Sequence, residues 1–295
     1  MPTFGAMTIK NVFDHYVKSL SSLYDGGEAT AITNWILEEE LGIVRAELST
    51  RGEEQINEVK ANDLAWKLMR LMKGEPVQYV LGYTFFHGLK LTVNKSVLIP
   101  RPETEELVEW ILDDLKKVSP QGHGSTEKIL DIGTGSGCIA IVLKKTFPEA
   151  EVYAMDVSER ALNVARENAE RNQSGINFYK DDILSPKSEI GNPKFEIIVS
   201  NPPYVLPSEK ESLHKNVLDF EPHEALFVPE DDPLIFYKAI LDFASINLAE
   251  NGCLYFEVNT LYVQKLAKLL RAKKFQSVEV RNDLSGKERM VKASK

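Results

Sequence analysis

The hydrophobic positions of the first 74 residues recur with the 3.6-residue period of α-helices. Three amphipathic stripes can be followed, and the second and third end near Gly42 and Gly74. Their apolar members are Ile9, Val12, Phe13, Tyr16, Val17 and Leu20; Ala31, Ile32, Trp35, Ile36 and Leu37; and Ile56, Val59, Leu64, Trp66, Leu68, Met69 and Leu71. We therefore expect a small helical domain over residues 1–74, with Trp35 and Trp66 in its core.

The pattern changes at the helix-breaking sequence Gly74-Glu75-Pro76. The apolar residues that follow form short runs separated by glycines, which favours strands. We expect a linking β-hairpin over residues 75–98. A second break, Ile99-Pro100-Arg101-Pro102, precedes a helical pattern over residues 103–117, and proline suits the first turn of that helix.

Residues 99–295 have the pattern of an α/β domain. Apolar runs of strand length alternate with helical patterns, which is typical of a mainly parallel sheet covered by helices on both faces. The expected strands are residues 128–133, 151–156, 177–182, 195–200, 252–258, 277–282 and 289–293. Only a short turn around Ser285-Gly286-Lys287 joins the last two, so we expect an antiparallel hairpin at the edge of the sheet.

The composition is that of an ordinary globular protein, with 43% hydrophobic and 27% charged residues among 295. No apolar run reaches the roughly 18 residues of a membrane span, and the first ten residues lack the features of a secretory signal. Cys138 and Cys253 lie in apolar runs, as expected for reduced thiols. The histidines show no metal-ligand spacing. We expect a cytoplasmic protein without membrane contact, and we take it to act as a monomer.

The sequence Asn201-Pro202-Pro203-Tyr204 follows an apolar run of strand length. Open α/β sheets place their chemistry at the carboxyl ends of such strands. The side-chain carbonyl of Asn201 and the backbone carbonyl of Pro202 could accept both N–H bonds of an –NH2 group, and Tyr204 offers a flat π-face. The pattern favours a site for an amide or for an amino group on a base. A rigid turn without chemistry is the competing interpretation, because Asn and Pro are common in turns.

A glycine-rich turn joins the first strand of the α/β domain to a predicted helix. It consists of Gly133, Thr134, Gly135, Ser136 and Gly137. Glycines let a ligand approach the backbone closely, but dinucleotide and adenosyl sites share this pattern. Asp131, two residues before the loop, and Asp156, at the end of the next strand, sharpen it. Asp156 could accept hydrogen bonds from ribose hydroxyls, and capping of the following helix is its alternative role.

The glycine spacing favours S-adenosylmethionine over a dinucleotide. In the dinucleotide fingerprint Gly-x-Gly-x-x-Gly the third glycine comes one residue later than here, and a pyrophosphate must lie at the helix N-terminus. S-adenosylmethionine has ribose and adenine but no phosphate. Asp182, at the end of the third strand, could accept from the adenine amino group, with Ile183 beside the ring. An ordinary loop acid is the alternative interpretation of Asp182.

The glycine loop, Asp156, the Asn-Pro-Pro-Tyr sequence and the terminal hairpin together resemble the class I S-adenosylmethionine-dependent methyltransferases. This resemblance implies a Rossmann-like α/β fold with a seven-stranded sheet, here with a small N-terminal helical domain added. Members of this class with Asn/Asp-Pro-Pro-Tyr methylate nitrogens conjugated to a planar system.

Further stretches are similar to the signatures of the HemK/PrmC family. They are residues 74–83 and 98–105, Phe220-Glu221-Pro222 with Ala225-Leu226, and residues 283–289. The similarity covers roughly residues 70 to 293, and the helical module agrees in kind only. One position departs from the family, in which a glycine closely follows the Glu after the fifth strand. Here Glu257 is followed by Val258-Asn259, which leaves the role of this turn open.

The resemblance implies methyl transfer from S-adenosylmethionine to N5 of the glutamine in the Gly-Gly-Gln loop of peptide chain release factors. Carried over, the glycine loop, Asp156 and Ile183 line the cofactor, and Asn201 also touches it. Asn201, Pro202 and Tyr204 are the implied catalytic residues. The implied substrate-binding residues are Asn201, Pro202, Pro203, Tyr204, Phe85, Arg101 and Pro102. The helical domain is expected to recognise the substrate protein.

Two other functions remain open at this point. A nucleic-acid methyltransferase uses the same chemistry on the amino group of an adenine or cytosine that is flipped out or single-stranded. The net charge of −9 counts against it, since tight nucleic-acid binding needs a basic surface, and no large basic insert is present. A non-catalytic adaptor that binds S-adenosylmethionine is the second alternative. The intact glycine loop, Asp156 and Asn201 count against it.

Overall fold

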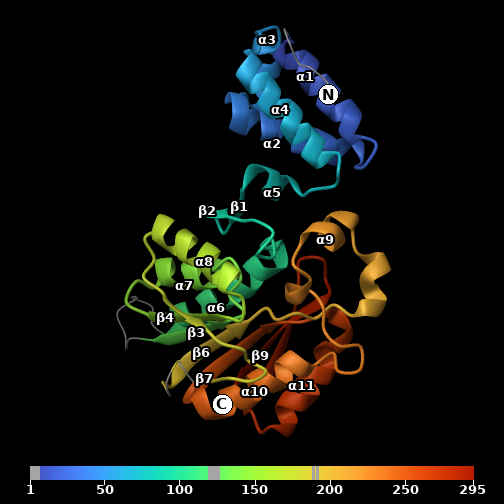
Figure 1. The fold of residues 1–295 in the computed structure, drawn as a ribbon. Coiled ribbons are helices and arrows are strands. Elements are labelled where there is room, and N and C mark those ends of the chain that lie inside the picture. Colours follow the sequence, from blue (N-terminus) through green and yellow to red (C-terminus); the bar gives the residue numbers. More distant parts are fainter. Residues whose placement is uncertain (1–6, 119–126, 188–189, 191–192) are drawn as a thin grey trace. The chain divides into compact units, whose positions relative to one another are not determined.

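The computed structural model describes residues 7–118, 127–187, 190 and 193–295 (Figure 1). Residues 1–6, part of the stretch expected to lack a secretory signal, lie outside the described residues. The chain divides into two compact units. The helical unit comprises the residues up to Gly82 together with His214–Phe220, and the α/β unit comprises Tyr83–Leu213 and Glu221–Lys295. Among the described residues, no helix combines the length and the apolar character needed to cross a membrane.

The helical unit contains the three helices predicted from the N-terminal stripes. Its elements are α1 (Ile9–Leu20), α2 (Gly26–Leu41), α3 (Leu48–Arg51), α4 (Glu58–Leu71), α5 (Val77–Leu81) and α9 (Lys215–Phe220). The side chains of Thr8, Asp25 and Asn57 accept hydrogen bonds from first-turn N–H groups of α1, α2 and α4. Gly42 ends α2 in the left-handed conformation, with φ 66°. The predicted helices are therefore confirmed.

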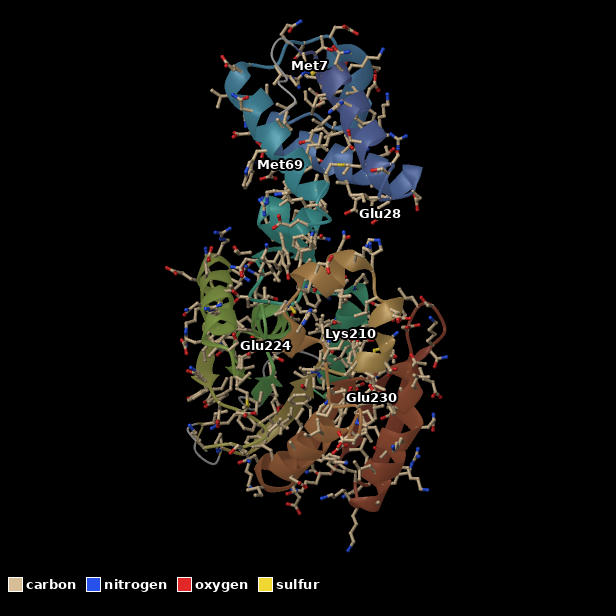
Figure 2. All side chains as sticks on the ribbon, turned by 45° about the vertical axis from the view of Figure 1, so that its right-hand side comes forward. Met7, Glu28, Met69, Lys210, Glu224 and Glu230 are labelled. Carbon is tan, nitrogen blue, oxygen red and sulfur yellow. The ribbon has the colours of Figure 1, made fainter. Side chains whose placement is uncertain are left out.

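The outer side of α4 differs from the prediction. Leu64 and Leu68 are buried in the core of the unit, but Trp66 is 53% exposed. Met69 is also exposed (Figure 2). The guanidinium of Arg70 lies 4.6 Å from the centroid of the Trp66 ring and gives it a polar neighbour at the surface. The prediction that Trp66 belongs to the core is wrong, because apolar residues occupy more than one face of α4. Trp35 packs against the core and is partly buried.

The prediction of strands directly after Pro76 is wrong for Val77–Leu81, which form α5. A short apolar run has no period that separates a strand from a helical turn. Arg70 stabilises the helical turn, since its guanidinium donates to the carbonyl oxygens of Tyr79 (3.0 Å) and Val80 (3.1 Å). Glu75 holds this guanidinium through two hydrogen bonds of 2.8 Å.

A second part of the chain completes the helical unit. The segment His214–Phe220, which contains α9, belongs to it although it lies far along the sequence. The side-chain amide of Asn216 donates to the Tyr24 hydroxyl at 2.7 Å, and the ring of His214 stacks on Tyr24 at a centroid distance of 6.1 Å. No periodic signal in the sequence marks this segment as part of the N-terminal helices.

The α/β unit confirms the predicted strand pattern. Its elements are β1 (Tyr83–Phe86), β2 (Leu89–Thr92), α6 (Pro102–Val118), β3 (Lys128–Ile132), α7 (Cys138–Thr146), β4 (Glu151–Asp156), α8 (Glu159–Arg171), β5 (Asn177–Lys180), β6 (Phe195–Ser200), α10 (Ile235–Asn247), β7 (Leu248–Glu257), α11 (Val263–Ala272), β8 (Ser277–Asn282) and β9 (Glu288–Ser294). The β1–β2 hairpin stands apart from a seven-stranded sheet with the order β5-β4-β3-β6-β7-β9-β8. β9 is antiparallel to β7 and β8, so the terminal hairpin is present as expected.

Helices cover both faces of the large sheet (Figure 1). Ile129 of β3 faces a core shared with α6, α7 and α8, whereas its neighbour Leu130 faces the core shared with α10 and α11. Successive residues of a strand point to opposite faces, so a strand covered on both sides must be apolar at nearly every position. This explains why continuous apolar runs predicted these strands.

Asn168 of α8 ties together two backbone segments of the α/β unit. Its side chain is completely buried. Oδ1 accepts from the N–H of Thr92 (2.7 Å), and Nδ2 donates to the carbonyl oxygens of Thr92 and Ser136 (2.9 Å each). The end of β2 and the glycine-rich loop therefore depend on one side-chain amide.

We expect Asn168→Ala to lower the free energy of unfolding by about 3 kcal/mol, because buried backbone groups lose their hydrogen-bond partners. Urea denaturation followed by circular dichroism measures this change. The matched control is Glu170→Ala, on the exposed side of the same helix, which should change stability by less than about 0.5 kcal/mol. Equal effects of the two substitutions would contradict the assigned role of Asn168.

Candidate active site

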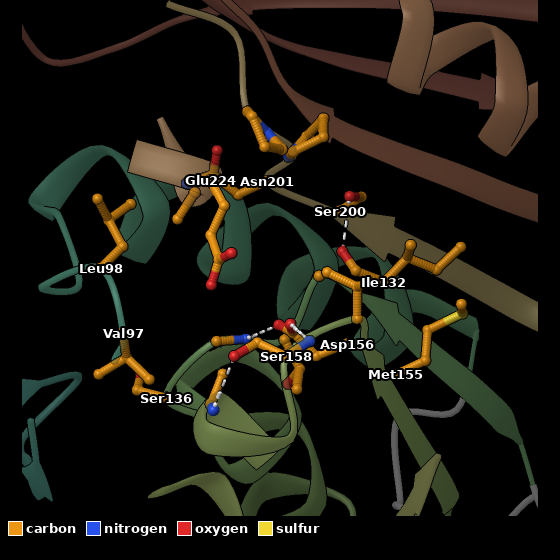
Figure 3. A pocket seen from close by; sticks show the side chains of 18 of the residues that line it. Val97, Leu98, Ile132, Ser136, Met155, Asp156, Ser158, Ser200, Asn201 and Glu224 are labelled. Atoms are coloured by element: carbon orange, nitrogen blue, oxygen red, sulfur yellow. Dashed lines mark hydrogen bonds between the residues drawn. The ribbon is translucent and has the colours of Figure 1, made fainter. Parts of the chain in front are cut away.

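The strand order of the α/β unit brings three polar segments to one edge of the sheet. β3 lies between β4 and β6 and is parallel to both. The glycine loop after β3, Asp156 at the end of β4 and Asn201 after β6 therefore meet. They line a pocket of about 1080 Å³, a volume that includes space open to solvent (Figure 3).

The glycine loop presents bare backbone to this pocket. Gly133 and Gly135 have positive φ values of 73° and 55°, and a Cβ atom added at either would meet no atom within 4 Å. The N–H groups of Gly133 and Thr134 donate to the carbonyl of Met155 in β4, which fixes the loop. Gly137 packs against Ala165 of α8 and is not among the described residues that line the pocket.

Asp156 is held by two backbone N–H groups. Its carboxylate oxygens accept from Gly135 and Ser158, each at 2.9 Å (Figure 3). Burial raises the pKa of Asp156, and these hydrogen bonds oppose the rise. The cap of α8 is Ser158, whose Oγ accepts from the N–H of Ala161. Since each carboxylate oxygen has two lone pairs, Asp156 keeps acceptor capacity for a ligand.

Two buried polar atoms beside the loop lack partners among the described residues. They are Oδ1 of Asp131 and the hydroxyl of Ser136. The other carboxylate oxygen of Asp131 accepts from the Thr134 hydroxyl at 2.6 Å. Complete burial raises the pKa of Asp131 to about 7, against the effect of that hydrogen bond. Ser136 lines the pocket, but its hydroxyl is buried.

The pocket is rich in carboxylates. Its lining includes Asp156, Asp181, Asp182 and Glu224, and among the described lining residues Arg101 alone is cationic. Glu224 points into the space above Asp156 (Figure 3). Arg101 donates to the buried Glu221 at 2.6 Å, so much of its charge is balanced. These charges favour a cationic ligand over a pyrophosphate.

Asp182 and Ile183, expected beside an adenine, both line the pocket. Oδ1 of Asp182 accepts from the N–H of Leu184 at 2.9 Å, which is what an ordinary loop acid does. Its position therefore agrees with both interpretations made from the sequence.

Asn201 presents its amide oxygen without a partner. Nδ2 donates to the Thr104 hydroxyl at 3.1 Å, whereas no described residue donates to Oδ1. The carbonyl of Pro202 likewise receives no hydrogen bond from the described residues. Asn201, Pro202 and Pro203 line the pocket. The partly buried Tyr204 is not part of its lining, and the Tyr204 hydroxyl donates to Glu257 at 3.0 Å.

Glu257 is a site residue to which the sequence assigned no role. It is 1% exposed, and Oε2 accepts from the Thr104 hydroxyl at 2.6 Å. Burial raises the pKa of Glu257, while the hydrogen bonds from Thr104 and Tyr204 and the charge of Arg289 oppose this. In the sequence, only its match to the family pattern indicated that Glu257 belongs to the site.

The turn after Glu257 needs no glycine in this chain. Asn259, which follows Val258 where the family has glycine nearby, has a φ of −60° that any residue adopts. Its side chain accepts from the N–H of Leu261 (3.0 Å) and donates to the carbonyl of Tyr204 (3.3 Å). Asn259 thereby joins the turn to the Asn-Pro-Pro-Tyr segment.

The other residues expected around the substrate are less closely gathered. Arg101 lines the pocket, but Phe85 and Pro102 are not among its described lining residues. Phe85 is 55% exposed on β1, in an edge-to-face contact with Tyr83. Pro102 is exposed at the first position of α6.

Comparisons with known proteins agree over both units. The chain matches the family models Methyltransferase small domain over residues 110–219 and PrmC N-terminal domain over residues 12–82. A release factor glutamine methyltransferase of Flavobacterium psychrophilum is 43% identical, with 98% of this chain and 99% of that protein covered. One of Bacteroides thetaiotaomicron is 40% identical, with 94% and 97% covered.

A solved structure shares the fold at low sequence identity. It is the 16S rRNA N2 G1207 methyltransferase RsmC of T. thermophilus, in complex with AdoMet and guanosine. The two chains are 16% identical, with a TM-score of 0.50 and coverage of 72% of this chain and 49% of that one. This likeness concerns the fold alone.

The raised pKa of Asp131 makes a prediction about stability. The ordinary pKa of this carboxyl is 3.8, and burial raises its pKa in the folded protein to about 7. Its protonation therefore favours the folded state, and this stabilisation is complete below the ordinary pKa and lost as the pH rises through the folded pKa. Asp131→Asn cannot ionise. Without ligand, its free energy of unfolding relative to wild type should rise between about pH 4 and pH 8 by up to roughly 4 kcal/mol.

Urea denaturation at a series of pH values measures this difference. Asp113→Asn serves as the control, because it removes an exposed carboxylate of α6 and leaves the buried Asp131 in place. Parallel pH profiles of Asp131→Asn and wild type would show that the assignment is wrong.

Proposed function

Since the chain belongs to the family of release factor glutamine methyltransferases, we propose that it methylates the side-chain amide nitrogen of a glutamine in a peptide chain release factor. The glutamine of the Gly-Gly-Gln loop is the proposed target. Neither alternative, methylation of a nucleic-acid base or a non-catalytic adaptor role, has a specific observation in its favour. We place this activity in the cytoplasm and assign it to the monomer.

The cofactor is S-adenosylmethionine, and the residues of the pocket suit it. The bare backbone at Gly133 and Gly135 allows close approach. The lone pairs left on Asp156 can accept from ribose hydroxyls. The excess of carboxylates matches a ligand that carries positive charge on sulfur and on its amino group. When bound, S-adenosylmethionine supplies a methyl group on a sulfonium sulfur, and the C–S electron pair leaves with that sulfur.

One observation carries the proposed reaction. Asn201 lies in the same pocket as the glycine loop, and its Oδ1 and the carbonyl of Pro202 are both unpartnered acceptors. Two acceptors on one short segment match the two N–H bonds of a primary amide. Tyr204 is the proposed stacking surface for the amide plane, with its hydroxyl fixed on Glu257.

An amide nitrogen is a weak nucleophile, because its lone pair is delocalised into the carbonyl. The acceptors at Asn201 and Pro202 stabilise the positive charge that develops on nitrogen when it forms the new N–C bond. They would also fix the position of the nitrogen in the pocket, and such positioning accounts for several kcal/mol of a barrier. The nitrogen then releases one proton to solvent. No strong base is needed before the attack.

We assign recognition of the release factor to the helical unit. Residues 12–82 match the PrmC N-terminal domain, and α4 exposes Val59, Trp66 and Met69 on its outer side. Exposed aromatic and methionine side chains are typical of protein interfaces. The assignment also agrees with the expectation from the sequence that residues 1–74 bind the protein substrate.

Asp156→Ala should weaken S-adenosylmethionine binding at least about tenfold, because hydrogen bonds to a charged group are each worth about 1.5–3 kcal/mol. Isothermal titration calorimetry measures the Kd. Glu159→Ala, an exposed carboxylate three residues further on, should leave it unchanged. An unchanged Kd in Asp156→Ala would remove Asp156 from the cofactor site.

Asn201→Ala should lower methyl transfer to a purified release factor about 100-fold, the scale of losing one preorganised hydrogen-bonding group. Its Kd for S-adenosylmethionine should change much less. Transfer is measured with radiolabelled cofactor, and Asn163→Ala on the exposed face of α8 is the control. Label must disappear when the glutamine of the Gly-Gly-Gln loop is replaced. Label on nucleic acid alone, or wild-type turnover in Asn201→Ala, would refute the proposed function.

A further inference from the structure

A chain of hydrogen bonds runs from the Asn201 amide to a buried carboxylate behind the pocket. We propose that Glu257, acting through the hydroxyl of Thr104, fixes the direction of the Asn201 amide, so that Thr104 and Glu257 are positioning residues for methyl transfer. The effect on turnover rests on the proposed function. The orientation itself is a property of the protein without substrate.

The orientation of the Asn201 amide follows from counting the protons that each group in the chain can donate. Two hydroxyls that point at Glu257 and the charge of Arg289 favour its ionised form, which has no proton to donate, so Thr104 gives its single proton across the 2.6 Å to Oε2 of Glu257. Its oxygen can then only accept at its second contact, which lies 3.1 Å from Nδ2 of Asn201. The amide of Asn201 must therefore turn its –NH2 toward Thr104. Its oxygen is left facing away from the chain.

This direction decides what the pocket offers to a substrate. The two ends of an amide have similar shapes, so packing alone distinguishes them poorly. Turned by 180°, Asn201 would present donors to the donors of a substrate –NH2 group. The acceptor that binds the nucleophile would be lost, although every residue of the Asn-Pro-Pro-Tyr segment would remain in place. The ionised carboxylate of Glu257, at the end of the hydrogen-bond chain, has no proton to donate. It therefore prevents this reversal of the Asn201 amide.

The Glu257 carboxylate also positions the aromatic ring of Tyr204. Oε1 of Glu257 accepts from the Tyr204 hydroxyl at 3.0 Å, so its two oxygens hold Tyr204 directly and Asn201 through Thr104. The backbone around Glu257 is fixed as well, since the Tyr237 hydroxyl donates to its carbonyl at 3.0 Å. Thr104 and Glu257 are 153 positions apart in sequence and both buried, which makes a rigid link between α6 and the end of β7.

The negative charge of the Glu257 carboxylate is compensated by the groups around it. Arg289 favours the ionised form of Glu257, and the hydroxyls of Thr104 and Tyr204 both donate to it. Keeping a buried carboxylate ionised costs stability unless such partners are present. A glutamine here would have a single oxygen for two donors, and its –NH2 could reverse the chain. The ionised acid gives one direction only.

The first test uses the full-length protein with ¹⁵N-labelled asparagine and no substrate. The side-chain –NH2 signal of Asn201 is identified by its absence in Asn201→Ala. Thr104→Val keeps the shape of the side chain but removes the hydroxyl, so the hydrogen-bonded proton of this signal should move upfield. In Thr104→Ser, which keeps the hydroxyl, it should stay near its wild-type position. A signal that is unmoved in Thr104→Val would overturn the inference, whatever the activity.

The second test is a double-mutant cycle on kcat for methylation of a release factor. Thr104→Val should lower kcat about tenfold, as expected for a hydrogen bond worth roughly 1.4 kcal/mol. In the Asn201→Ala background it should have less than about a twofold effect, because Thr104 acts through Asn201. Thr104→Ser should recover most of the lost turnover. The same loss in both backgrounds would mean that Thr104 has a merely structural role, and would overturn the inference.

The outcomes separate this inference from the proposed function. If wild-type protein methylates no release factor, the function is refuted, and the Asn201 signal still decides the orientation. If Thr104→Val does not fold, Glu257→Gln replaces it, and it should move the Asn201 signal and lower kcat in the same direction. An unchanged signal with unchanged kcat in Glu257→Gln would show that the carboxylate does not orient the amide.

Discussion

The site depends on the parallel pairing of β3 with β4 on one side and with β6 on the other. In this register Ile132 is opposite both Met155 and Ser200, so the three strands end within one residue of one another. The residues at or just after these ends supply the glycine loop, Asp156 and Asn201. A slip of one residue in either pairing would turn the strand's side chains to the opposite face. Because both faces of these strands are apolar, the fit of the individual side chains in the two cores, and not their hydrophobicity alone, must hold the register and with it the geometry of the pocket.

The polar groups behind the pocket oppose the stability of this core. Asp131 and Glu257 are both buried carboxylates, and burial raises the pKa of each. They differ in how they are satisfied. Glu257 accepts from two hydroxyls near a guanidinium, whereas one oxygen of Asp131 has no partner among the described residues. Such violations of burial rules are typical of functional sites, where orientation or ligand binding compensates for the lost stability.

The sequence predicts the sheet better than it predicts the site. A strand buried on both faces needs a continuous apolar run, so local composition reveals it, and the terminal hairpin follows from a short connection. The exposed position of Trp66 and the helix at Val77–Leu81 were not predicted. An apolar residue can lie at the surface as well as in the core, and a short apolar run does not distinguish a helical turn from a strand. Thr104 and Glu257 were missed for another reason. Their contact spans 153 positions, and no local pattern encodes it.

The two acceptors in the pocket do not by themselves set the specificity. Acceptors for an –NH2 group suit an amide or a base equally, and a fold shared with an RNA methyltransferase at a TM-score of 0.50 does not choose between them. The chain passes between the two units more than once. After Tyr204 it leaves the α/β unit at Leu213, contributes α9 to the helical unit, and returns at Glu221, which binds Arg101 in the pocket wall. The chain between the Asn-Pro-Pro-Tyr sequence and Glu221 therefore contributes residues to both units.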